Sequence, residues 1–493
     1  MVGAPGCVAS QRTPLRAGLD ARSFIPIERS PALSRALPNS VHARDVEYLL
    51  HPVTNARKHE EIGPIVIDRG EGIYVFDDQG NRYLEAMAGL WSVGVGFGET
   101  RIADAAQRQM AKLPYYHSFS HKSNEPAIDL AERLVKMAPD RLARAFFTNS
   151  GSEANDTVVK MVWYYNNARG KPQKKTFLAR QNAYHGITMA SGSLTGLPVN
   201  HRDFDLPILP VKHLTCPHYW RFGQPGESEA AFSQRLADEL EATIEELGAD
   251  TIAAFIGEPL MGAGGVLPPP VGYWEHVQRI CRKHDILIVA DEVINGFGRL
   301  GTMFACEHYG IEPDMLVLSK QLTSSYAPLA AILFSDAIYQ GIADNTAKIG
   351  TFGHGFTASA HPVSCAVAME NLDIIEEKAL VENAREQGRV PQRELARFRD
   401  HPLVGEVRGE GLIAAVELVR DKATKARFDP VGTAGGYLFA KGHEHGVIIR
   451  AIGDQIAFCP PMIITSEEVV DMVARFERAL EDTHRWLVDS GKL

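Results

Sequence analysis

A lysine and an aspartate stand at the ends of two short apolar runs in this sequence. Lys320 follows Leu316-Val317-Leu318-Ser319, and Asp291 follows the apolar residues 286–290. Such runs are normally buried on both faces of a parallel sheet, where charged side chains are rare. Burial lowers the pKa of an amine, which lets a lysine attack a carbonyl carbon. Lys320 could therefore form a Schiff base and Asp291 could pair with a pyridinium nitrogen, as in a pyridoxal phosphate (PLP) site.

Both residues also have simpler explanations. Lys320 could only leave the sheet into a loop, and Asp291 could be a buried helix cap or one member of an ion pair. The surroundings matter here, because ligands of open α/β sheets bind beyond the carboxyl ends of the strands. Polar segments follow three other apolar runs, at residues 148–153, 182–186 and 257–259. Strand ends that converge on one edge are a stronger signal than any single motif.

The segment Ser150-Gly151-Ser152-Glu153 has the Ser-x-x-Glu pattern of a capping box, which opens a helix. Free backbone N–H groups at a helix start are a natural phosphate site, so Ser150, Gly151 and Ser152 are candidate phosphate ligands. Most such boxes only cap helices. Close to the lysine and aspartate, however, this one supplies the phosphate contact that a PLP site needs.

Tyr184 and His185 are the candidate functional residues of the segment 182–186. The ring of Tyr184 could stack on a cofactor ring, and His185 could support Asp291 or contact that ring. The alternative is a turn with a packed aromatic side chain.

Short apolar runs alternate with helix-like segments through the middle of the chain. We expect strands at residues 176–179, 252–256, 286–290 and 315–318, and helices at residues 151–169, 231–247 and 273–283. This alternation predicts an α/β fold with a mainly parallel sheet between helices. From residue 360 onward, helices, one of them over residues 380–399, give way to strands such as 446–450. This change indicates a smaller α+β domain.

The expected domains follow from these patterns. They are a loose N-terminal extension (1–40), an N-terminal part of the small domain (41–88), the large α/β domain (89–360) and the C-terminal small α+β domain (361–493). Ordered structure is expected to begin near Tyr48. The arginine-rich extension is either a plain extension or an organellar transit peptide, and its prolines weaken an amphipathic helix. We expect the plain extension and a cytoplasmic protein.

Composition argues against several classes of partner. The formal net charge is -10 and no basic stripe stands out, which argues against nucleic acid. No apolar stretch is long enough to span a bilayer, so no membrane partner is expected. The six cysteines are scattered, without a C-x-x-C pair. This pattern indicates reduced thiols, and we expect no metal site.

Matching stretches in one order connect the chain to a known family. They lie at residues 87–91, 149–155, 183–186, 257–259, 290–293, 296–299, 319–320, 361–362 and 459–461. On these motifs the chain resembles the class III PLP-dependent aminotransferases of fold type I, in the ω-transaminase branch. The resemblance covers nearly everything from about residue 46 to the C-terminus. It implies PLP as the cofactor and a homodimer with shared active sites, with a tetramer as the alternative.

The resemblance also implies a role for each matching residue. Lys320 links to PLP and then moves a proton between two substrate carbons, while Asp291 binds the pyridine nitrogen. The other implied cofactor contacts are Gly151 and Ser152 on the phosphate, Phe356 and Thr357 reaching across to the other subunit's phosphate, Val293 on the ring face opposite Tyr184, and Glu258 near Asp291.

Two further positions concern the substrate. Trp91 resembles an aromatic wall of the substrate pocket, and Arg450 resembles a mobile arginine that meets a substrate carboxylate. Alone, Trp91 could be core packing and Arg450 a surface residue. An arginine that swings in for a keto acid and out for an apolar amine would serve both substrates without a buried unpaired charge. The chain departs from common family forms at Gln321, Ser325, Ala358 and Ala360.

The expected function is PLP-dependent transamination by a ping-pong mechanism. The amino group would pass from an amine or ω-amino acid to a keto acid, pyruvate by family expectation. The alternatives are an aminomutase, racemase or decarboxylase on the same fold, or a PLP-binding protein without turnover. A requirement for a second, keto-acid substrate separates these enzymes. The sequence leaves the amino donor open.

Overall fold

The computed structural model describes Leu37 and residues 39–493. The expected extension over residues 1–40 lies almost entirely outside these described residues. The chain divides into two compact units, residues 1–68 and 69–493, which are described separately. The domain boundaries expected from the sequence stay a prediction.

Two helices form the described part of the first unit. They are α1 (Val41–Tyr48) and α2 (Ala56–Ile62). Side chains cap both helix starts: Ser40 accepts from the backbone N–H of Ala43, and Asn55 accepts from that of Lys58. Ordered structure therefore begins before Tyr48, contrary to expectation. Ser40, which caps α1, marks this earlier start of ordered structure.

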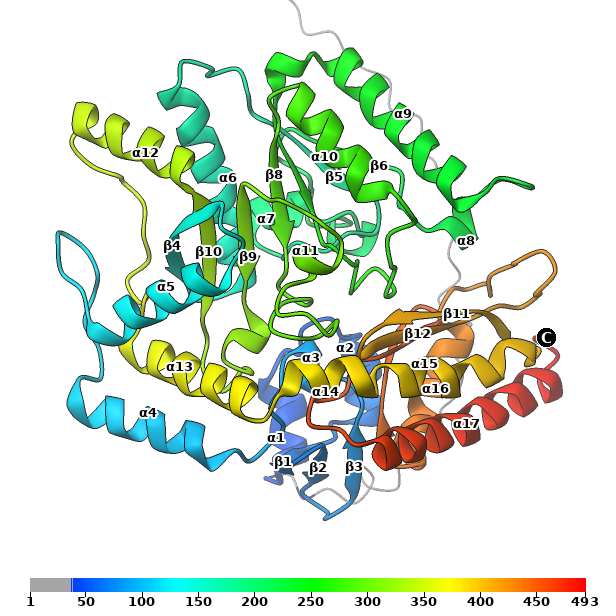
Figure 1. The fold of residues 1–493 in the computed structure, drawn as a ribbon. Helices are drawn as coiled ribbons and strands as arrows, with labels where there is room; N and C mark the ends of the chain where they lie inside the picture. Colours follow the sequence, from blue (N-terminus) through cyan, green and yellow to red (C-terminus); the bar gives the residue numbers. More distant parts are fainter. Residues whose placement is uncertain (1–36, 38) are drawn as a thin grey trace, which may run out of the picture. The chain divides into compact units, whose positions relative to one another are not determined.

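A seven-stranded sheet forms the centre of the second unit (Figure 1). Its strands run in the order β4 (Leu142–Thr148), β10 (Ala330–Ser335), β9 (Met315–Leu318), β8 (Leu287–Asp291), β7 (Ile252–Gly257), β5 (Thr176–Arg180) and β6 (Val211–Leu214). The pairs from β9 to β6 are parallel, and β10 is antiparallel to both of its neighbours. The expected, mainly parallel sheet is confirmed. All strands but β10 therefore end at the same edge.

Both faces of this sheet are buried, which explains its continuous apolar runs. In β8, Leu287 and Val289 pack in one apolar cluster, whereas Ile288 and Ala290 belong to another. The first cluster includes Val158 of α6 (Gly151–Ala168), and the second includes residues of α10 (Tyr273–Lys283). Helix α10 packs on β8, and α9 (Glu229–Leu247) packs on α10 (Figure 1).

The C-terminal segment contributes strands to two smaller sheets. One has the order β11 (Val404–Glu410), β12 (Ile413–Leu418), β15 (Gln455–Phe458) and β14 (Arg450–Ile452). In the other, β2 (Tyr74–Asp77), β3 (Arg82–Glu85) and β13 (Val447–Ile448) are neighbours, and β1 (Ile67–Glu71) spans the boundary between the two units. Strand β13 is parallel to β3. The expected strand at residues 446–450 is therefore split between two sheets.

The remaining helices of the second unit surround these sheets. They are α3 (Ala88–Trp91), α4 (Thr100–Lys112), α5 (Glu125–Met137), α7 (Met189–Leu194), α8 (Tyr219–Phe222), α11 (Ala305–His308), α12 (Asp336–Ile349), α13 (Pro362–Glu377), α14 (Leu380–Gln387), α15 (Arg389–Ala396), α16 (Thr433–Glu444) and α17 (Ser466–Asp489). The single helix expected over residues 380–399 is wrong. It breaks at Gly388, where a Cβ would lie 2.4 Å from the backbone of Gly411.

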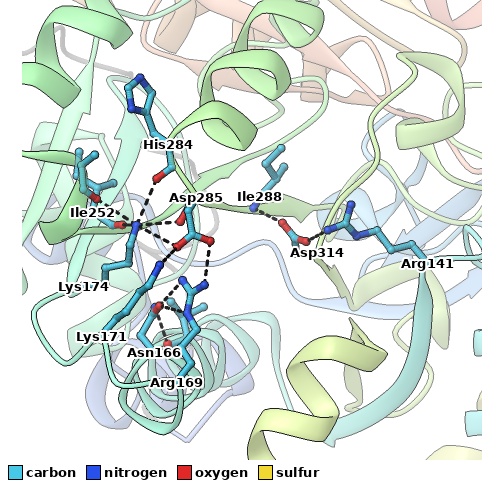
Figure 2. A network of polar contacts seen from close by, with 12 residues as sticks. Arg141, Asn166, Arg169, Lys171, Lys174, Ile252, His284, Asp285, Ile288 and Asp314 are labelled. Atoms are coloured by element: carbon cyan, nitrogen blue, oxygen red, sulfur yellow. Dashed lines mark hydrogen bonds and ion pairs between the residues drawn. The ribbon is translucent and has the colours of Figure 1, made fainter.

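A buried lysine joins strands at the amino-terminal edge of the large sheet (Figure 2). Lys174 is 1% exposed, and its Nζ donates to the carbonyl oxygens of Ala249 (3.1 Å), Ile252 (3.0 Å) and Asp285 (2.8 Å). The carboxylate of Asp285 also pairs with Arg169 at 2.8 Å. These contacts tie together the segments that enter β5, β7 and β8. They lie at the sheet edge opposite the strand ends singled out in the sequence.

No helix in the described part of the chain is long and apolar enough to cross a membrane. The five cysteines among the described residues are all free and buried.

Candidate active site

Lys320 begins a short 3-10 turn (Lys320–Leu322), which Ser319 separates from the end of β9. Its φ of 44° lies in the left-handed region, which is uncommon for a residue with a side chain. The half-buried side chain lines a cavity of about 350 Å³. Burial lowers the pKa of Lys320, although the charges of Asp291 and Glu258 act in the opposite direction. A lowered pKa favours the neutral amine, which is the nucleophilic form.

Asp291 is the last residue of β8 and lines the same cavity. It is 2% exposed, and its Oδ2 accepts from His185 Nδ1 (2.7 Å) and Asn155 Nδ2 (2.8 Å). Its Oδ1 accepts from the backbone N–H of Val293 at 3.1 Å. Burial would raise the pKa of Asp291, but these hydrogen bonds and the charge of His185 hold it below its ordinary value. The side chain therefore stays a carboxylate at neutral pH.

The start of α6 forms another wall of the cavity, with Ser150, Gly151 and Ser152. Ser150 is the N-cap, and its Oγ accepts from the backbone N–H of Glu153 at 3.2 Å. The Glu153 carboxylate accepts from the N–H of Asn149 (2.8 Å), one residue before the position that a capping box requires. The first N–H groups of a helix have no intrahelical partner, so this end can bind an anion.

Glu258 and Tyr184 close the cavity beyond β7 and β5. The buried Glu258 carboxylate accepts from the backbone N–H groups of Tyr184 (3.0 Å) and Gly262 (2.8 Å). Burial raises the pKa of Glu258, and the nearby charge of Asp291 adds to this effect. Val293 lines the cavity as well, and it packs closely on Gly151, where a Cβ would lie 3.2 Å from Val293 Cγ2.

Arg450 and Trp91 do not line this cavity. Arg450 begins β14, and its charge lowers the pKa of Tyr184 and of Lys320, so it lies near both. Its Nε is buried without a hydrogen-bond partner in the described part of the chain. Trp91 is 2% exposed and packs in an apolar cluster with Ile294, which does line the cavity.

Phe356 and Thr357 are also absent from the cavity wall. Thr357 is exposed, and its carbonyl oxygen accepts from the Tyr115 hydroxyl at 2.7 Å. Phe356 is half-buried and packs edge-on against His354, with ring centroids 5.3 Å apart. Neither residue contributes to the site of its own chain in this structure.

Sequence reasoning gave no role to two buried residues, Asn155 in the cavity wall and Gln321 next to Lys320. Asn155 Nδ2 donates both to Asp291 and to the carbonyl oxygen of His185 (2.7 Å). Its spacing carried a signal, since it stands four residues after Gly151 on the same helix face. Gln321 Nε2 donates to the Gly296 carbonyl oxygen (2.8 Å), and its Oε1 accepts from Arg299 (3.2 Å). No sequence pattern points to these partners.

The cavity combines the three groups that PLP requires. A helix start can take the phosphate, a permanent carboxylate can pair with a protonated ring nitrogen, and an amine of lowered pKa can take the aldehyde. The residues therefore fit PLP, and they come from the five strand ends that the sequence analysis expected to converge.

Comparisons with known proteins agree with this geometry. The family profile "Aminotransferase class-III" matches residues 54–480. A tomato (Solanum lycopersicum) protein named gamma aminobutyrate transaminase 3, chloroplastic, is 48% identical over 91% of this chain and 87% of its own length. The vanillin aminotransferase of Capsicum annuum is 46% identical over 89% of this chain and 95% of its own.

Solved structures give the same result. The ω-transaminase from Pseudomonas jessenii, in a complex with pyridoxamine phosphate (PMP), has a TM-score of 0.90 and 60% sequence identity. The match covers 91% of this chain and 99% of that chain. The fold of PLP fold type I, the cofactor and the reaction type expected from the sequence are thereby confirmed. The chain belongs to the class III aminotransferases, which are PLP-dependent enzymes that transfer amino groups.

Proposed function

We propose that this aminotransferase moves the amino group of an amine or ω-amino acid to pyruvate, in two half-reactions at one site. The observation that carries the proposal is Lys320, an amine of lowered pKa that shares its cavity with the Asp291 carboxylate. The names of the tomato and Pseudomonas relatives support a donor whose amino group is not on an α-carbon.

Each residue of the cavity has a proposed task. When bound, PLP supplies an aldehyde that takes the amino group and a ring that accepts electrons from the substrate carbon. Lys320 Nζ would take the proton from that carbon as a general base and return it, as a general acid, to the carbon that carried the cofactor's aldehyde. The Asp291 carboxylate keeps the ring nitrogen protonated, and His185 and Asn155 hold this carboxylate in place.

The remaining residues bind and orient the reactants in this proposal. Gly151 and Ser152 hold the phosphate, and Tyr184 and Val293 pack on opposite faces of the ring. Arg450 pairs with the carboxylate of the keto acid, because its buried Nε lacks a partner in the described part of the chain. Trp91 supports the wall of the amine pocket through Ile294.

An amino-donor panel with pyruvate as acceptor tests the proposal. The panel contains β-alanine, 4-aminobutyrate, a diamine and an arylalkylamine, and alanine formation is measured. We expect alanine from at least one donor, and no alanine from the Lys320→Ala variant at the same protein concentration. Turnover without a keto acid, or unchanged alanine formation by Lys320→Ala, would contradict the proposal.

We also propose a homodimer in which Phe356 and Thr357 serve the site of the other chain. Their position outside the cavity of their own chain supports this arrangement. Light scattering should give twice the chain mass, and an active monomer would contradict it. We expect a cytoplasmic enzyme, with organellar import as the alternative because the tomato relative is named as chloroplastic. Imaging residues 1–40 fused to a fluorescent protein distinguishes the two.

A further inference from the structure

Two histidines and an aspartate of the first compact unit converge at one point. Asp45 lies on α1, His59 lies on α2, and His51 lies in the connection between them. The Nε2 atoms of His51 and His59 lie 2.9 Å and 2.8 Å from the same oxygen, Asp45 Oδ1. One potential ligand atom from each residue lies within 4.8 Å of the other two. We call these three residues the Asp45 cluster.

The donor set and its surroundings fit a metal ion. Two imidazoles and one carboxylate are the ligands of many zinc sites in which water takes the fourth position. Tetrahedral bonds of about 2.05 Å place ligand atoms about 3.3 Å apart, so each imidazole nitrogen needs to move only a few tenths of an ångström away from Asp45 Oδ1. Their side chains are 13–28% exposed, which leaves access for water.

Hydrogen bonds alone could also explain the cluster. The charges around Asp45 help to judge that alternative. Asp45 forms no ion pair with a lysine or arginine among residues 39–493. The two imidazole rings stand close to each other, with centroids 4.2 Å apart and planes at 43°. When two imidazole rings point at one carboxylate oxygen, a metal cation can replace the hydrogen atoms of their hydrogen bonds.

Two similar clusters in the second unit lack these properties. The two carboxylates beside His218 are already neutralised by two arginines, because Arg408 pairs with Glu406 (2.5 Å) and Arg221 pairs with Glu417 (2.5 Å). His401 Nδ1 accepts from the backbone N–H of Leu403, so its Nε2 carries the hydrogen and cannot also bind a metal. The Asp45 cluster has neither obstacle.

We propose that Asp45, His51 and His59 bind one divalent transition-metal ion, with Zn²⁺ as the best fit and water at the fourth position. The ion links α1, α2 and their connection, so its role is structural. Cysteine spacing gave no sign of this site, because none of its ligands is a cysteine. The proposal does not depend on the substrate of the aminotransferase.

Zinc titration of the full-length holoenzyme tests the proposal. Tag-free protein is treated with a chelator, dialysed and titrated with ZnSO₄ in a calorimeter. Visible absorption after addition of Co²⁺ reports the ligand geometry. We expect one Zn²⁺ per chain, and binding weakened at least about tenfold in Asp45→Asn and in His59→Gln, since even the loss of outer-shell partners costs that much. Zn²⁺ should also raise the thermal midpoint of the wild type but not of these variants.

His42→Gln is the matched control, since His42 also lies on α1 but outside the cluster. This variant should bind Zn²⁺ like the wild type. The PLP absorbance of every variant verifies that the protein is folded. Absence of Zn²⁺ binding in the wild type would overturn the proposal, and so would equal binding by folded His59→Gln. An octahedral Co²⁺ spectrum that does not change in the variants would overturn it as well.

Discussion

At the scale of single residues, Gln321 supports the backbone of its neighbour Lys320. Its side chain is 1% exposed and connects the carbonyl oxygen of Gly296 with the buried guanidinium of Arg299. Gly94 approaches it so closely that a Cβ there would lie 2.4 Å from Gln321 Oε1. A glycine at this position could make none of these side-chain contacts. Gln321 therefore helps to hold the left-handed backbone of Lys320.

Replacing Gln321 by leucine should damage both stability and turnover. Leucine fills a similar volume but leaves the Gly296 carbonyl and one Arg299 nitrogen without their partner, which costs about 1–3 kcal/mol of unfolding free energy. We also expect kcat to fall about tenfold or more, because a slightly misplaced reacting group loses up to about a hundredfold in rate. Urea denaturation and the kinetics of alanine formation measure the two effects.

Gln278→Leu is the matched control for this prediction. Gln278 is likewise buried, donates to the Gly310 carbonyl oxygen (2.9 Å) and accepts from the Glu312 N–H (2.8 Å). Unlike Gln321, it is not adjacent in the chain to a residue that lines the cavity. It should lose similar stability and keep its kcat. Equal kcat losses in both variants would show that Gln321 acts only through stability.

The sequence predicted functional residues correctly where a charged side chain stood at an unusual position. Lys320 and Asp291 stood out because charged residues rarely end apolar runs, and the structure brings both into one cavity. Asn155 and Lys174 were missed for the opposite reason. Both are ordinary polar residues whose partners are far away in the sequence, so only the folded chain shows their contacts.

At the scale of elements, the start of α6 has two separable tasks. Ser150 caps the helix through the N–H of Glu153, and it also lines the cavity in which the phosphate is proposed to bind. An aspartate is as good an N-cap as serine, whereas alanine is not. Only the aspartate, however, brings a negative charge to the phosphate.

Two substitutions of Ser150 should therefore separate helix stability from PLP binding. Ser150→Ala should lower the unfolding free energy of the apoenzyme by about 1 kcal/mol. Ser150→Asp should leave this stability nearly unchanged and weaken PLP binding more than the alanine does. Ser228→Ala removes the cap of α9, where Ser228 accepts from the Ala231 N–H, and should cost stability without affecting PLP. Tighter PLP binding by Ser150→Asp than by Ser150→Ala would contradict this view.

Elements with a strong local pattern were predicted well. The helix expected at residues 273–283 and the strand at residues 315–318 have the same bounds in the structure. The wrong predictions concern segments whose structure depends on contacts with residues far away in the sequence. Residues 380–399 look like one helix, yet Gly388 meets the backbone of Gly411 and the helix breaks there. Residues 446–450 look like one strand, yet they pair in two different sheets.

At the scale of the whole molecule, two buried acids make stability depend on pH. Burial raises the pKa of Glu85 to about 8 and that of Glu292 to about 7, although backbone N–H groups partly oppose this effect. Between about pH 4.5 and these values, the folded chain retains protons that the unfolded chain has already lost. The free energy of unfolding therefore falls as pH rises through this window. The stabilisation that the two protonated acids provide is fully present only below the window.

Glu85→Gln should remove most of this loss at alkaline pH. Glutamine keeps an acceptor for the Gly89 N–H but cannot ionise. The variant should melt near the wild type at about pH 5 and several degrees above it at about pH 9. Thermal unfolding followed by circular dichroism measures both. Glu275 is exposed, and Glu275→Gln serves as the control. Its melting temperature should stay near that of the wild type at both pH values. A shift of equal size at both pH values would contradict the assignment.

The large sheet also separates stability from chemistry, since its two edges carry different groups. Lys174 binds four carbonyl oxygens at the amino edge, whereas Lys320 and Asp291 lie at the carboxyl edge. Burial lowers the pKa of Lys174, but the nearby Asp285 carboxylate acts in the opposite direction. The Nζ of Lys174 is the shared hydrogen-bond donor that holds the entries of β5, β7 and β8 together.

Lys174→Met should therefore destabilise the protein without slowing the reaction. Methionine keeps the length and the apolar stem but removes the donor, which should cost about 1–3 kcal/mol because the carbonyl groups stay buried. The kcat/KM for the best donor should stay unchanged below the unfolding transition. Lys175→Met is the control, because its Nζ forms a single side-chain bond with Asn167 at the surface. A loss of kcat/KM without a loss of stability in Lys174→Met would mean that the amino edge of the sheet takes part in catalysis.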